Sequence, residues 1–176
     1  MHASEIISTA IQPLKPRDTV ARVLDLLDEF KLAQLPVVQA DRLVGILKDS
    51  VLMDNSDPEA TVAKLMDAVE IPYVRDHQHI YDVLKLMVQR GLSVVPVLDM
   101  GGRYLGAVSE HEALRRMAAL INVAEAGSVV ELEMNRNDYS LQQIARIVED
   151  EGARLISVYC SDLPDSTRQE VTLKIN

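Results

Sequence analysis

Aromatic residues are scarce in this sequence. Its 176 residues contain no tryptophan, one phenylalanine and five tyrosines. A core dominated by aromatic rings is therefore excluded, and aliphatic side chains must fill the interior. Hydrophobic residues make up 48% of the chain and charged residues 26%. These proportions are typical of a soluble globular protein that is long enough to bury a core without disulfides.

Cysteine is nearly absent as well. Cys160 has no second cysteine to pair with, so no intramolecular disulfide forms, which suits a reducing compartment. Because free cysteine is among the most buried residue types, we expect Cys160 to lie inside the fold. No apolar run approaches the ~20 residues that span a bilayer, and the N-terminus lacks the basic and apolar regions of a signal peptide. These absences predict a cytoplasmic protein without a membrane partner.

Basic residues are outnumbered by acidic ones. The chain has 18 Lys and Arg against 27 Asp and Glu, a formal net charge of −9. Nucleic-acid binding relies on clustered basic residues, so this balance argues against a nucleic-acid partner. A local basic pocket for one small anion remains open.

An internal repeat is the main positive feature of the sequence. The stretch "LPVVQADRLVGILKDS" (35–50) returns as "VPVLDMGGRYLGAVSEHE" (95–112), with Pro36 aligned on Pro96 at an offset of 60 residues. The same offset aligns the apolar positions of a preceding helical stretch. These pairs are Val20 with Ile80, Val23 with Val83, Leu24 with Leu84 and Leu27 with Met87.

Each copy carries the same order of predicted elements. Apolar spacing of i, i+3, i+4 and i+7 predicts helices over about 20–27, capped by Asp18 or Thr19, and about 80–88, closed by Gly91. Two β-branched runs joined by a turn predict a hairpin in each copy. A helix follows from about Asp49 in the first copy. The last helix, over about 110–123, would bury Ala113, Leu114, Met117 and Ile121.

Neither copy can bury its sheet face alone. The sequence therefore predicts an α+β fold in which two β-α-β-β-α repeats, 1–60 and 61–124, pack as a pair. Residues 127–176 form a different module, because alternating apolar residues predict strands around Val130–Met134, Ile156–Cys160 and Val171–Ile175, with a helix between the first two. This β-α-β-β module ends directly after a strand. We expect either that another chain completes its sheet or that the sequence is truncated.

The repeat resembles the cystathionine β-synthase (CBS) domain pair. The stretches that carry the resemblance are "LAQLPVVQADRLVGILKDSVL" and "GLSVVPVLDMGGRYLGAVSEHEAL", with "KLM" at 64–66 in the linking helix. The tail, "VVELEMNRNDYSLQQIARIVEDEGARLISVYCSDL", is similar to the first β-α-β-β of an ACT domain. A CBS pair followed by an ACT-like domain is the layout of acetoin-utilisation protein B and its relatives.

This resemblance implies a regulatory, non-enzymatic protein. CBS pairs bind adenine nucleotides (AMP, ADP, ATP) or S-adenosylmethionine in clefts between the repeats, and they usually form dimers. ACT domains commonly bind amino acids at their interfaces. The resemblance implies no further cofactor and leaves the regulated protein unidentified.

The family's ligand motif is Gly-x-x-Ser/Thr-x-x-Asp, in which the hydroxyl meets phosphate and the Asp accepts from the ribose. The second copy has Gly106, Ser109 and Glu112 at these positions, and the first has Lys48 and Val51 in place of the last two. The resemblance therefore implies at most one competent site, at the second copy. The alternative is a plain capping box, in which Ser109 and Glu112 only stabilise a helix start.

The purine side of such a cleft would come from the other copy. By the resemblance its walls are Gln12, Leu32 and Ala33, with Pro36 nearby, although these residues are equally suited to a core. The chain's histidines lack a partner set with zinc-like spacing, so we expect no metal. It also shows no activated nucleophile, Walker loop or paired carboxylates, so we expect no catalysis.

Two functional hypotheses remain open. In the first, a cytosolic sensor binds an adenine nucleotide or S-adenosylmethionine and changes the conformation of a homodimer. In the second, a dimerising scaffold keeps only vestigial nucleotide sites, and an amino acid enters through the ACT-like module.

Overall fold

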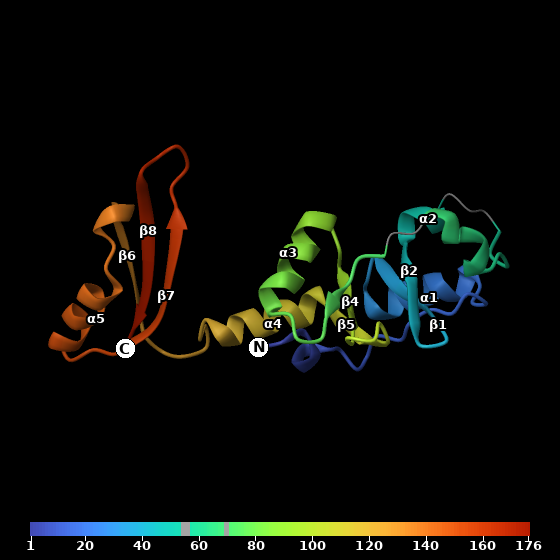
Figure 1. Cartoon of the computed structure of the whole chain (residues 1–176), viewed down its shortest axis with the longest axis horizontal. Helices are drawn as coiled ribbons and strands as arrows, with labels where there is room; N and C mark the ends of the chain where they lie inside the picture. Colours follow the sequence, from blue (N-terminus) through green and yellow to red (C-terminus); the bar gives the residue numbers. More distant parts are fainter. Residues whose placement is uncertain (54–56, 69–70) are drawn as a thin grey trace. The chain divides into compact units, whose positions relative to one another are not determined.

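The repeat in the sequence is also a repeat in the fold. The computed structural model describes residues 1–53, 57–68 and 71–176, and it divides into two units, Met1–Arg116 and Met117–Asn176 (Figure 1). The first unit holds both copies. In the first copy the elements are η1 (Ala3–Ile6), α1 (Val20–Phe30), β1 (Gln34–Gln39), β2 (Arg42–Lys48) and α2 (Asp49–Met53). In the second they are η2 (Val62–Ala68), β3 (Val74–Arg75), α3 (Ile80–Arg90), β4 (Val94–Leu98), β5 (Tyr104–Ser109) and α4 (Glu110–Leu120).

Both copies build the same small sheet. Strand β1 pairs antiparallel with β2, and β4 pairs antiparallel with β5. Strand β3 adds to β4 in parallel, and in the first copy its place is taken by a single parallel bridge between Leu14 and Val37. The predicted α+β fold with two β-α-β-β-α repeats is confirmed.

Local sequence signals explain where the helices begin and end. The Thr19 hydroxyl accepts a hydrogen bond from the Arg22 amide at the start of α1. Gly91 ends α3 with φ at 60°, a left-handed conformation that glycine adopts without a steric penalty. Both were predicted, and both are confirmed.

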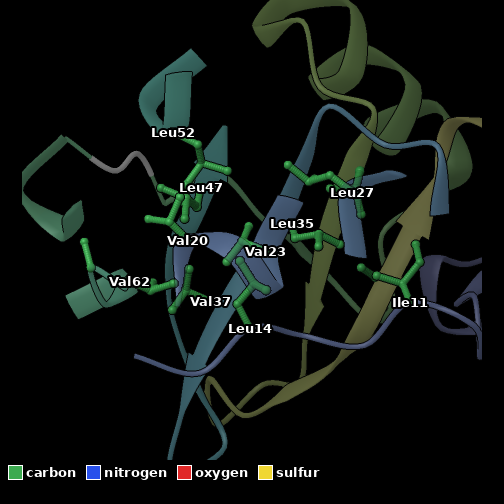
Figure 2. Packing of buried hydrophobic residues seen from close by; sticks show 13 residues of the cluster. Ile11, Leu14, Val20, Val23, Leu27, Leu35, Val37, Leu47, Leu52 and Val62 are labelled. Carbon is green, nitrogen blue, oxygen red and sulfur yellow. The ribbon is translucent and has the colours of Figure 1, made fainter. Parts of the chain in front are cut away.

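The core of the first unit is aliphatic and crosses the repeat. Figure 2 shows Leu14, Val23 of α1 and Val37 of β1 pointing toward one another. Val94 and Ala107 of the second copy belong to the same cluster. Each fully buried Leu or Val contributes roughly 1.5–3 kcal/mol to folding. The two copies therefore share one hydrophobic core. This agrees with the expectation that a single copy cannot bury its own sheet face.

Two details of the predicted helices differ from the structure. Leu24 is 44% exposed and Leu114 is 68% exposed, although both belong to apolar stripes. The buried residues of these stripes are Val20, Val23 and Leu27 in α1 and Ala113 alone in α4, whereas Leu114 lines a cavity. Helix α4 also ends at Leu120, three residues earlier than predicted, and the turn after it places Asn122 at φ 53°.

The second unit contains one sheet and one helix. Its elements are β6 (Ser128–Asn135), η3 (Arg136–Asp138), α5 (Leu141–Asp150), β7 (Leu155–Asp162) and β8 (Arg168–Ile175). The strands lie in the order β6-β8-β7 and are all antiparallel. Figure 1 shows α5 alongside this sheet, and Ile144 of α5 packs with Val171 and Leu173 of β8.

Cys160 is exposed, so the expectation of burial was wrong. It lies near the end of β7, a strand at the edge of the sheet. A ten-residue helix is about 15 Å long, whereas an eight-residue strand spans about 26 Å. Helix α5 therefore cannot cover both ends of β7. None of the helices in the described part of the chain combines the length and apolarity needed to span a bilayer.

Candidate ligand-binding site

A cavity of about 580 Å³ lies where β5 passes into α4. Both copies contribute to it, together with the N-terminal segment. Its lining consists of Ser8, Ala10, Ile11, Phe30, Lys31, Leu32, Ser93, Ser109, Glu110, His111 and Leu114.

Gly106 allows the N-terminal segment to reach this cavity. Its φ is 148°, and a Cβ atom at this position would clash with the Cγ2 atom of Ile7. Without a side chain at Gly106, the segment lies against β5, and the Ser8 amide donates to the Ala107 carbonyl at 2.8 Å. This contact places Ser8, Ala10 and Ile11 at the cavity.

The wall from the first copy comes from the end of α1. Lys31 ends the helix in a left-handed conformation with φ at 53°, and the Leu32 amide donates to the Leu27 carbonyl at 3.0 Å. The backbone bond between the lining residues Ser93 and Glu110 has an equivalent in the first copy, away from this cavity. The Glu110 amide donates to the Ser93 carbonyl, and the Asp49 amide donates to the Ala33 carbonyl, each at 2.9 Å.

A capping box consists of two hydrogen bonds, one accepted by the Ser side chain and one accepted by the Glu side chain. The structure shows the first of them, through which Ser109 caps α4. Its Oγ accepts from the Glu112 amide at 3.2 Å. The Glu112 carboxylate is bound in the other direction along the helix. Arg115 donates to it through Nε at 2.9 Å and Nη2 at 2.7 Å, and Arg116 donates through Nε at 2.7 Å.

These arginines change the acidity of Glu112. The hydrogen bond from Arg115 is the largest cause and that from Arg116 acts in the same direction, so they lower the pKa of the carboxyl to about 2 against the opposing effect of desolvation. The side chain is only 16% exposed. Glu112 is therefore a carboxylate throughout the physiological range, and its charge is already matched by two cations.

The structure brings together two of the predicted site residues. Ser109 and Leu32 line the same cavity. Gln12 and Ala33 are exposed next to lining residues, Pro36 is buried within β1, and neither these three nor Glu112 belongs to the lining.

Sequence reasoning missed the hydroxyls of Ser8 and Ser93, the ammonium group of Lys31 and the imidazole of His111, all of which belong to the lining. Ser93 could have been predicted from the sequence, because it occupies the repeat position equivalent to Ala33. Ser8 could not have been predicted, because its position depends on pairing with a strand about a hundred residues away in the sequence.

The lining suits a ligand with an apolar ring and an anionic group. Three serine hydroxyls and the start of an 11-residue helix offer hydrogen bonds and a favourable dipole to an anion. The apolar wall is formed by Ile11, Phe30, Leu32 and Leu114. Within residues 1–53, 57–68 and 71–176, no three His, Cys, Asp or Glu side chains are arranged to hold a metal ion.

The equivalent position in the first copy has different chemistry. Lys48 ends β2, where the second copy has Ser109, and Val51 of α2 packs against the hydrophobic core. The Asp49 carboxylate accepts from the Ser50 amide at 2.6 Å. Neither a hydroxyl at the strand end nor a carboxylate one turn later is present in this copy.

The family model for the CBS domain matches residues 3–56 and 59–119. The chain belongs to the CBS domain family. The matched residues cover both copies of the repeat and the cavity between them.

Curated relatives match the CBS pair at low identity. A 17.7 kDa uncharacterized protein of Acidianus ambivalens is 26% identical over 118 residues, which are 65% of this chain and 71% of that protein. An inosine-5'-monophosphate dehydrogenase of Methanocaldococcus jannaschii is 24% identical over 115 residues, 65% of this chain and 23% of the enzyme. The similarity thus spans less than a quarter of the dehydrogenase.

Solved structures share the CBS fold. A CBS domain pair/ACT domain protein from Thermotoga maritima has a TM-score of 0.60 at 21% identity and covers 69% of this chain and 99% of that chain. CBSX2 in complex with AMP has a TM-score of 0.58 at 22% identity, with coverage of 68% and 97%. The cytosolic domain of the Mg²⁺ channel MgtE in complex with ATP has a TM-score of 0.54 at 27% identity, with coverage of 65% and 48%.

Proposed function

We propose that this protein is a regulatory sensor whose CBS pair binds an adenine nucleotide or S-adenosylmethionine in the cavity at the β5–α4 junction. The observation that carries the proposal is the lining itself, in which Ser109 at a helix start faces the same cavity as the apolar Leu32. Binding changes the conformation of a homodimer, and no catalytic step is involved. The neighbours that are complexes with AMP and ATP support this choice of ligand.

The proposed contacts follow the two sides of the cavity. The Ser109 hydroxyl and the amides at the start of α4 meet the phosphate, while Leu32 packs on the purine, with Gln12 and Ala33 beside it. Pro36, which is buried within β1, belongs to the strand that follows this wall and does not touch the ligand. Glu112 is the proposed ribose acceptor. In its bonds with Arg115 and Arg116, its Oε1 accepts from both arginines, whereas its Oε2 accepts from Arg115 alone and retains a lone pair for a ribose hydroxyl. The neighbouring guanidinium groups bring positive charge close to the proposed phosphate.

The domain limits form part of the proposal. Residues 1–60 and 61–124 are the two CBS repeats, which the matches at 3–56 and 59–119 support. Exposed apolar side chains support dimerisation, because a helix surface of this kind is usually covered. They include Tyr81 and Val88 of α3, which are 62% and 83% exposed.

Thermal melting of the full chain tests the nucleotide site. Millimolar AMP, ATP or S-adenosylmethionine at 100 times its dissociation constant adds about 2.7 kcal/mol to the free energy of unfolding, which raises the melting temperature by several degrees. We expect Ser109→Ala to abolish this shift. No shift with any of the three ligands contradicts the proposal.

A matched control separates ligand contact from helix capping. Ser140 caps α5 in the same way, since its Oγ accepts from the Gln143 amide at 3.3 Å. Ser140→Ala thus removes a comparable cap, worth about 1 kcal/mol, in the other unit. The ligand-induced shift must survive in Ser140→Ala and disappear in Ser109→Ala.

A second candidate function rests on the 127–176 module. Its β-α-β-β order and its sheet order β6-β8-β7 support an ACT-like interpretation, with an amino acid as the signal and the CBS pair as a dimerisation scaffold. In that case amino acids raise the melting temperature and nucleotides do not.

A further inference from the structure

A second cavity, of about 470 Å³, lies at the opposite end of β5 from Ser109. Tyr104 begins the strand and lines this cavity, whereas Ser109 ends it. At ~3.3 Å per residue the two positions are about 17 Å apart, so the cavities are separate sites. The other walls are the segment Pro13–Arg17 and the end of the β1–β2 hairpin, Val38–Asp41.

The Tyr104 hydroxyl is buried and has no hydrogen-bond partner among the described residues. Its backbone is fixed, because the Tyr104 amide donates to the Asp41 carbonyl at 2.8 Å. Burial raises the pKa of the phenol above its ordinary value, so the hydroxyl stays protonated and can donate. A buried polar group without a partner is costly, and a ligand with an acceptor oxygen would satisfy it.

The charge at the rim is positive in a chain of net charge −9. Lys15 and Arg17 line the cavity, and within the described residues neither side chain forms an ion pair. The single carboxylate of the lining, Asp41, already lies 3.7 Å from Arg103. Two cations are therefore available to an anion.

The β1–β2 turn has two non-glycine residues in a left-handed backbone conformation, which glycine adopts with less strain. Ala40 and Asp41 have φ of 47° and 60°, whereas the equivalent turn of the second copy has Gly102 at 78°. Left-handed conformations are unfavourable for residues with a Cβ atom. Both residues line the cavity, so the strained turn shapes its wall.

We propose that this cavity binds a small organic anion, with its carboxylate or phosphate at Lys15 and Arg17, its apolar body against Pro13, Pro16 and Val38, and an acceptor oxygen at the Tyr104 hydroxyl. The proposal is independent of the nucleotide site, because it uses none of the residues around Ser109. It gives the CBS pair a second input.

Titration of the full chain with phenyl phosphate and with benzoate, followed by ¹H–¹⁵N NMR, tests the proposal. We expect saturable shifts of the Arg17, Ala40 and Asp41 amides, and the tighter of the two probes identifies the anionic group. Lys15→Gln combined with Arg17→Gln should abolish them. Benzyl alcohol, which has the same ring without the charge, should bind at least tenfold more weakly.

Tyr104→Phe is the decisive variant. It removes only the hydroxyl, so the fold is retained and the melting temperature stays equal or rises, while binding weakens about two- to tenfold. Ser109→Ala should leave the affinity unchanged and thereby separates this site from the nucleotide cavity. Absence of saturable shifts with both anions, equal binding of benzyl alcohol, or unchanged affinity in Tyr104→Phe would overturn the proposal.

Discussion

At the scale of single residues, the most informative side chain is Glu112. The spacing Ser-x-x-Glu is compatible with a capping box and with a nucleotide motif. The structure adds a third role, because Arg115 and Arg116 hold the carboxylate from one turn further along α4. Their i+3 and i+4 spacing was visible in the sequence. The direction in which Glu112 turns was not, since the capping box and the two ion pairs compete for the same oxygens.

The ion pairs make the stability of the protein depend on pH through Glu112. Its pKa is lowered to about 2 in the folded protein against 4.5 as the ordinary value, so the contribution is full above about pH 5 and is lost as the pH falls toward 2. Because the arginine side chains are 58% and 36% exposed, solvent screens the pairs, and we expect Glu112→Gln to lower the free energy of unfolding by only about 1 kcal/mol at pH 7. Urea unfolding of wild type and Glu112→Gln at pH 7 and pH 3 measures this difference in the free energy of unfolding.

Glu110→Gln is the control for this prediction. Glu110 is exposed on the same helix turn, and within the described residues its carboxylate forms no hydrogen bond or ion pair. Its neutralisation should change stability by less than half as much. A difference between wild type and Glu112→Gln that is as large at pH 3 as at pH 7 would show that the arginine pairs are not its cause.

At the scale of elements, β5 organises the first unit. One of its edges pairs with β4, and Ser8 of the N-terminal segment bridges to Ala107. Both ends of the strand reach cavities, at Tyr104 and at Ser109. The segment can approach only because Gly106 has no side chain. A single glycine thus connects the strand to the lining of the nucleotide cavity.

We predict that Gly106→Ala costs about 3 kcal/mol of the free energy of unfolding, because the new Cβ atom both clashes with Ile7 and forces an unfavourable φ. Gly91→Ala is the matched control. Its φ of 60° is also left-handed, but a Cβ atom there meets nothing within 4 Å, so it should cost only about 1 kcal/mol. Chemical denaturation of both variants gives the difference. Equal costs would mean that the close approach of Ile7 is unimportant.

Elements were more predictable than sites. The helix face of Val20, Val23 and Leu27, the cap at Thr19 and the closing Gly91 follow from local spacing, and all are observed. Cavity linings combine segments that are distant in the sequence. Ser8 and Tyr104 gain their places through pairing with Ala107 and Asp41, and no local pattern records such pairing.

At the scale of the whole chain, the two units have separate interiors. Leu14, Val23 and Val37 belong to the core of Met1–Arg116, and Val171 with Leu173 belongs to the core of Met117–Asn176. Both cavities described above are lined by the first unit alone. An effect of the second unit on ligand binding must therefore act through coupling, which requires that a ligand favour one of two conformations.

Separate interiors predict that the two units open independently. Val23 and Val171 are both 0% exposed, and truncation of either to alanine removes about 2 kcal/mol of local stability. In hydrogen-exchange mass spectrometry we expect Val171→Ala to accelerate exchange about 30-fold within β6–β8 and to leave α1, β1 and β2 unchanged, since 1.4 kcal/mol corresponds to about tenfold. Val23→Ala should do the reverse. If either variant accelerates both units equally, they unfold as one cooperative body, and a signal entering at the second unit can reach the CBS pair through global stability alone.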